Sequence, residues 1–143
     1  MSTEIRQAHR GDFDTAKSVL EDAGLPVADL SIEHLAFVAE VNGRFVGAVG
    51  LESFGTIGLL RSLVVSTEAR ASGVGRRLVA ALETSAREQG TEVLWLLTID
   101  ADLYFQRLGY AVMNRANAPS AIRTTAEFSG LCPDDAVLMS KVL

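Results

Sequence analysis

The sequence has few of the residues that support disulfides, metal clusters or membrane spans. Cys132 is the only cysteine among 143 residues, which excludes an intrachain disulfide and a metal site built from several cysteines. Lysine occurs only at Lys17 and Lys141, and no basic cluster alternates with aromatic residues. That pattern and a formal net charge of −5 argue against nonspecific nucleic-acid binding. With no signal-like apolar segment and no long apolar run, we expect a cytoplasmic protein that needs no metal.

What the chain does contain is typical of one globular domain, expected over 1–143. Hydrophobic residues make up 48% of the sequence and charged residues 22%, a balance found in folded proteins. A chain of this length can bury about two-thirds of the surface that it exposes when unfolded. No linker, repeat or low-complexity segment divides it.

Hydrophobic periodicity predicts an α+β fold with a mixed sheet. Strands are expected at 4–8, 35–41, 44–51, 57–65, 93–97, 110–113 and 136–142. Helices are expected at 12–21, with Asp12 as N-cap, and at 27–33, 73–89, 101–108 and 120–128. Asn42-Gly43 is the strongest hairpin signal. An antiparallel N-terminal half and one helical crossover near the middle are therefore expected.

The most informative segment lies between the strand that ends at Val65 and the following helix. It reads Arg70-Ala71-Ser72-Gly73-Val74-Gly75-Arg76. A strand that passes through a glycine-containing turn into a helix directs backbone N–H groups outward and can bind phosphate without a metal. The glycines allow close approach of the backbone, and the arginines add positive charge.

Several kinds of phosphate loop could underlie this segment. The Walker loop has no match, because its Gly-Lys-Ser/Thr ending is missing. The dinucleotide fingerprint would need a third glycine where Leu78 stands, and Asp100 is a poor candidate for its acidic residue. A plain strand-to-helix turn without a ligand is the remaining alternative.

The segment resembles the acetyl-CoA loop of the GNAT acetyltransferases. The order of elements agrees from Ile5 to Tyr110, including Leu108-Gly109-Tyr110 after a short helix. The resemblance implies a central sheet of six to seven strands, splayed at the middle. It also implies that pantetheine pairs with Leu63, Val64 and Val65, and that the amides of 71–76 hold the pyrophosphate. The expected protein is an acetyl-CoA-dependent N-acetyltransferase of a small amine, monomeric or, slightly favoured, homodimeric.

The sequence departs from the family at two catalytic positions. The position at which the family often has a catalytic glutamate is occupied here by Leu59. Glu52 is therefore the candidate substitute, and the alternative is that Glu52 is a solvated carboxylate without a catalytic role. The position at which the family often has a tyrosine that protonates the thiolate is occupied here by Phe105. Tyr104, one place earlier, is the candidate proton donor, although adjacent helical positions point about 100° apart. A packing role for Tyr104 is the alternative.

Arg61 is the other candidate site residue. Strand alternation places it on the same face as Leu59 and Leu63, so its guanidinium needs an anionic partner. That partner is either internal, for instance Glu52, or a carboxylate or oxyanion of the substrate. His9 and His34 are expected to be surface or packing residues, and Cys132 is expected to be a buried thiol.

Some segments resemble a narrower group, the GNAT proteins associated with arsenic resistance. They are 47–52, 59–63, 126–128, 131–133 and 139–141. This resemblance implies an acceptor that is a small amino acid bearing an arsenical or phosphinate group, whose anion Arg61 could bind. The missing glutamate and displaced tyrosine leave a second function open, a non-catalytic acyl-CoA-binding sensor or accessory protein.

Overall fold

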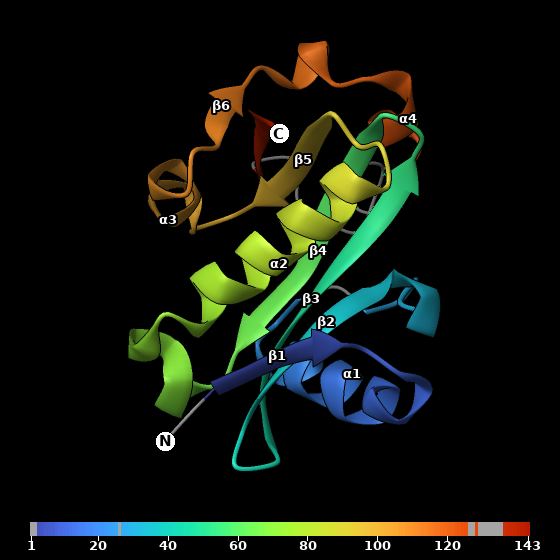
Figure 1. Cartoon of the computed structure of the whole chain (residues 1–143). Coiled ribbons are helices and arrows are strands. Elements are labelled where there is room, and N and C mark those ends of the chain that lie inside the picture. Colours follow the sequence, from blue (N-terminus) through green and yellow to red (C-terminus); the bar gives the residue numbers. More distant parts are fainter. Residues whose placement is uncertain (1–2, 26, 126–127, 129–135) are drawn as a thin grey trace. The chain divides into compact units, whose positions relative to one another are not determined.

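The computed structural model describes residues 3–25, 27–125, 128 and 136–143 (Figure 1). Its contacts divide the chain into two compact units, 1–51 with 61–85, and 52–60 with 86–143. Within the described residues, no helix combines the length and apolar character that a membrane crossing requires.

One mixed sheet contains seven strands in the order β1-β2-β3-β4-β5-β7-β6 (Figure 1). Strand pairs β1–β2, β2–β3, β5–β7 and β6–β7 are antiparallel, and β4–β5 is parallel. The strands are β1 Thr3–Gln7, β2 Leu35–Val41, β3 Arg44–Phe54, β4 Ile57–Val65, β5 Val93–Thr98, β6 Ala111–Met113 and β7 Val137–Val142. The expected mixed sheet, antiparallel in its N-terminal half, is therefore confirmed.

The first unit is built on the β2–β3 hairpin. Asn42 and Gly43 have φ of +52° and +77°, the left-handed conformations that a tight hairpin turn of this kind requires. Helix α1 (Phe13–Asp22) contributes Leu20 to the core of this unit. The other buried members of that core come from the strands: Val38, Ala48 and Val64. Apolar residues that recur at the strand period of two and at the helix period of 3.6 therefore pack into one cluster.

The second half of the chain begins with the expected crossover. Helix α2 (Val74–Glu88) connects β4 to β5, because parallel neighbours cannot be joined by a tight turn. The helices α3 (Asp102–Arg107) and α4 (Ser120–Arg123) follow. The second unit has its own apolar core, formed by Leu59, Trp95, Ala118, Ile122 and Leu138.

Two expected helices are wrong in extent. The segment 27–33 contains no α-helix, and a short 3-10 turn, η2 (Ile32–His34), forms at its end. The helix expected over 120–128 ends at Arg123. The Thr125 hydroxyl donates to the carbonyl of Ile122, and such side-chain bonds compete with continuation of a helix.

Asp12 precedes α1 but does not cap it with its side chain. Its carboxylate instead accepts from the backbone N–H of His9 at 2.8 Å and from both terminal nitrogens of Arg6. His9 accepts in turn from the N–H of Gly11, which completes a capping box on the preceding 3-10 turn, η1 (Arg10–Asp12). The carboxylate therefore stabilises the entry to α1 one turn earlier than expected.

Candidate functional site

The transition from β4 to α2 has the form expected of an anion-binding loop. After β4 the chain makes a 3-10 helix, η3 (Thr67–Ser72), and then Gly73 takes φ +80°, a conformation suited to glycine. Arg77 donates its backbone N–H to the carbonyl of Gly73. The amides of Val74, Gly75 and Arg76 precede that bond, at the positive end of a 15-residue helix.

Side chains of the loop support its backbone. Arg70 donates its Nε–H to the carbonyl of Val65 at 3.1 Å, and the Ser72 hydroxyl donates to the carbonyl of Ala69 at 2.6 Å. Arg76 is exposed on the first turn of α2. Positive charge therefore surrounds the N-terminal amides of the helix.

Strand β4 extends beyond its parallel ladder. That ladder joins Ile57, Gly58 and Leu59 to β5, and residues 61–65 continue past it. Of the three residues expected along the pantetheine, Val64 is buried in the core of the first unit, and Leu63 and Val65 are half-buried.

Ser62 interrupts the regular strand just before these residues. Its φ is +59°, a left-handed conformation that costs a residue with a side chain about 1–2 kcal/mol. Because of this irregularity, alternation alone does not place Arg61 and Leu63 on one face, and that expectation stays a prediction. Arg61 is 2% exposed, whereas Leu63 is half-buried.

Arg61 has an internal anionic partner that the sequence analysis did not identify. Its Nη1 and Nη2 donate to the two carboxylate oxygens of Asp29 at 2.6 and 2.7 Å. The Arg61 side chain is inaccessible to solvent, and that of Asp29 is 23% exposed. These bonds hold the pKa of the Asp29 carboxyl below its usual range, against the opposing effect of burial. No local sequence pattern identified Asp29 as the partner of Arg61, because the two residues are 32 positions apart and Asp29 lies in a segment that was expected to be helical.

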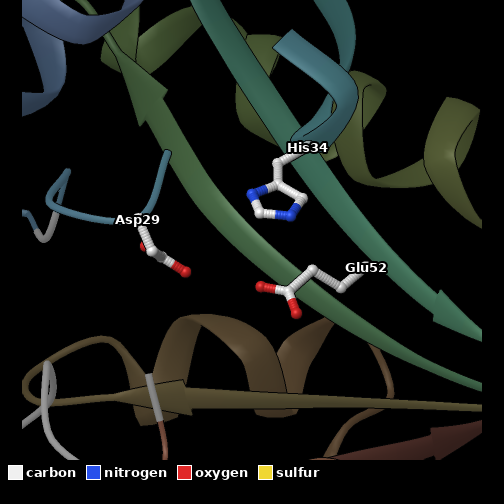
Figure 2. A group of neighbouring side chains, drawn as sticks. All are labelled: Asp29, His34 and Glu52. Carbon is white, nitrogen blue, oxygen red and sulfur yellow. The ribbon is translucent and has the colours of Figure 1, made fainter. Parts of the chain in front are cut away.

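His34 lies close to the same carboxylate. A ring nitrogen of His34 and a carboxylate oxygen of Asp29 are within 4.8 Å, and both side chains point into one region beside β4 (Figure 2). His34 Nδ1 is buried and has no hydrogen-bond partner in the part of the chain that the structure describes. Histidine and aspartate can bind metals, but both oxygens of Asp29 already accept from Arg61. His34 is half-buried, and its expected role as a surface or packing residue is not tested by these contacts.

The candidate catalytic residues Glu52 and Tyr104 belong to the second unit. Glu52, also drawn in Figure 2, is half-buried on β3. Tyr104 is half-buried on α3, and its ring meets that of Phe105 edge to face at 5.3 Å. Phe105 is 5% exposed and packs against Tyr110. Their catalytic roles stay predictions, and Cys132 lies outside the described residues.

Comparisons with known proteins agree with this architecture. Residues 4–110 match the acetyltransferase (GNAT) family. An uncharacterised N-acetyltransferase of Chlorobaculum tepidum is 35% identical over 64% of this chain and 60% of its own length. An amino-acid acetyltransferase of Neisseria meningitidis is 28% identical over 88% of this chain and 31% of its own. The matched part of this chain thus spans less than two-thirds of the length of each of these relatives.

A solved structure has the same fold over the whole of this chain. It is the N-acetylglutamate synthase of Neisseria gonorrhoeae complexed with coenzyme A and N-acetyl-glutamate, with a TM-score of 0.85, 24% identity and 35% of its own length covered. The expected fold, a seven-strand mixed sheet of the α+β class, is confirmed.

Proposed function

Because this chain belongs to the GNAT family of acetyltransferases, we propose that it binds acetyl-CoA and transfers the acetyl group to the amine of a small molecule. The observation that carries the proposal is the β4–η3–α2 transition, where Gly73 turns the chain into a helix with its first amides facing outward. We propose further that 1–143 acts as one acetyltransferase domain in the cytoplasm.

In this proposal the cofactor lies along β4 and ends at α2. The main-chain groups of Leu63, Val64 and Val65 pair with the amides of pantetheine, as an added strand would. The amides of 71–76, together with the Arg70 and Arg76 guanidiniums, hold the pyrophosphate. The N-acetylglutamate synthase of the same fold is complexed with coenzyme A, which supports a coenzyme A site in this fold.

The proposed acceptor is the α-amine of a small amino acid. The names of two relatives, an amino-acid acetyltransferase and an N-acetylglutamate synthase, support this class. Amino acids with an arsenical or phosphinate group are the narrower candidates, on the segments that resemble arsenic-resistance proteins. The bond between Arg61 and Asp29 supports the internal role of Arg61, so an anionic acceptor would need a further partner or would compete with Asp29.

The chemistry is direct transfer between two bound substrates. The amine attacks the thioester carbonyl, an N–H stabilises the developing oxyanion, and CoA leaves as a thiolate that must gain a proton. Tyr104 is the proposed donor of that proton, and Glu52 is the base proposed from the sequence. The second candidate, binding of acyl-CoA without turnover, rests on Leu59, which fills the usual place of the base.

Thermal unfolding with acetyl-CoA and a thiol-release assay test this function. Acetyl-CoA at 100 times its Kd should stabilise the fold by about 2.7 kcal/mol. G73A should weaken acetyl-CoA binding by roughly tenfold, since a side chain strains the loop at φ +80°. G24A is the matched control, with φ +77° in the turn after α1 and nothing within 4 Å of the added methyl.

The outcomes separate the two candidate functions. Thiol release with small amino acids supports the transferase, whereas stabilisation by acetyl-CoA without release from any amine supports the binding protein. No stabilisation by acetyl-CoA contradicts both. Sedimentation of the same samples tests the proposed homodimer against a monomer.

A further inference from the structure

The proposed transfer needs a group that removes a proton from the acceptor. At neutral pH an α-amine is largely an ammonium, which has no lone pair to attack a thioester. In the family pattern a glutamate often serves, but this chain has Leu59 there, fully buried in an apolar core. The transfer therefore requires another proton acceptor near β4.

Two glycines of β3 distinguish the faces of the sheet around β4. A Cβ on Gly47 would lie 3.1 Å from Leu78 of α2, so α2 covers that face. A Cβ on Gly50 would collide with the carbonyl oxygen of His34 and approach Arg61. Residues three apart in a strand point to opposite faces. The η2 turn and Arg61 therefore lie on the face of the sheet opposite to α2.

This arrangement decides how an acceptor can approach. In the proposed function the cofactor lies along the edge of β4 at 63–65, with its phosphates at the start of α2. Because α2 covers one face, an amine must reach the thioester from the other. Asp29 and His34 lie close together there (Figure 2), and Arg61 is bonded to Asp29.

Within this group His34 is the side chain free to exchange a proton. Arg61 stays protonated, and its two bonds to Asp29 keep that carboxylate ionised and fixed. The half-buried imidazole of His34 lies within 4.8 Å of the Asp29 carboxylate. Its Nδ1 is buried and has no hydrogen-bond partner among the described residues. In the neutral ring that accepts a proton at Nε2, Nδ1 carries the hydrogen.

We propose that His34 is the catalytic base of this protein and that Asp29, fixed by Arg61, is its positioning residue. The inference rests on the proposed acetyl transfer. His34 Nε2 takes a proton from the acceptor ammonium, and the freed lone pair forms the C–N bond at the thioester carbonyl. The C–S bond then breaks, Tyr104 gives its proton to the thiolate and takes the second proton of that nitrogen, and His34 returns its own proton to solvent.

The charged groups around His34 bear on its pH dependence. Asp29 comes from the preceding turn and Arg61 from β4. Glu52 is the competing base, so E52Q belongs in the same experiment.

The test compares H34Q, H34A and E52Q with H9Q, which alters the other of the two histidines, in a turn remote from β4 in sequence. With acetyl-CoA and an amino acid that the unaltered protein acetylates, H34Q and H34A should lose about 100-fold or more in kcat. Stabilisation by acetyl-CoA should be retained in both. Added imidazole should restore turnover to H34A, and the acid limb of kcat/KM should disappear in H34Q.

Each other result counts against the inference. H34Q with activity within a few-fold of the unaltered protein overturns it, as does a loss in H34A that imidazole does not rescue while E52Q abolishes the acid limb. Failure of the proposed function looks different, because the unaltered protein would then release no thiol with any amine. That outcome contradicts the transfer and this inference together.

Discussion

Replacement of Asp29 by asparagine should destabilise the fold far more than the partial exposure of Asp29 suggests. The change leaves the Arg61 guanidinium, whose side chain is inaccessible to solvent, without the carboxylate that accepts its bonds at 2.6 and 2.7 Å. Loss of one partner from a buried pair costs about 3–5 kcal/mol. Asp29 is 23% exposed and asparagine keeps one acceptor oxygen, so we expect about 2–3 kcal/mol.

Urea unfolding measures this loss, and a surface pair supplies the control. Arg44 and Glu68 are 2.9 Å apart, with side chains 70% and 58% exposed, so E68Q should cost under about 1 kcal/mol. The double variant D29L/R61M should recover much of the stability, because apolar groups can replace a buried ion pair at little cost.

Equal shifts of the unfolding midpoint in D29N and E68Q would show that the buried pair contributes no more stability than the exposed one. A double variant D29L/R61M that is less stable than D29N would show that the cost comes from lost packing. At this chain length, 2–3 kcal/mol corresponds to roughly 5–10 °C in Tm, which thermal unfolding resolves easily.

Two further perturbations test the packing and electrostatics of the first unit. G47A should cost about 1–3 kcal/mol in urea unfolding, because its Cβ would lie 2.8 Å from the carbonyl oxygen of Val64; a midpoint equal to that of the unaltered protein would contradict this close approach. Acidification should lower Tm, because three carboxyl groups have pKa values lowered by arginines in the folded state: Asp12, Asp29 and Glu40. Their stabilisation is full above the unfolded pKa of about 4 and is lost as pH falls through the folded values. Replacement of Arg6 by methionine, which removes the partner of two of them, should flatten the dependence of Tm on pH, and an unchanged slope would refute the assignment.

Local patterns predicted most of the backbone. The strand at 57–65 and the hairpin turn at Asn42-Gly43 agree with the structure, because alternation and left-handed φ requirements act over a few residues. The helix expected at 73–89 agrees to within one residue at each end. The patterns failed at 27–33, where tertiary contacts such as the bond from Asp29 to Arg61 hold a non-helical segment.

The sequence by itself determined the order of elements, the glycine turn into α2 and membership in the GNAT family. These depend on spacing along the chain. Only the tertiary structure decided which groups surround Arg61, because its partner Asp29 is distant in sequence and is brought near by β4. The left-handed Ser62 likewise interrupts the regular strand on which the sequence interpretation of Arg61 relied. The glycine turn into α2 could thus be predicted from adjacent residues, whereas the pairing of Asp29 with Arg61, and the His34 beside it, arises from the folding of the chain.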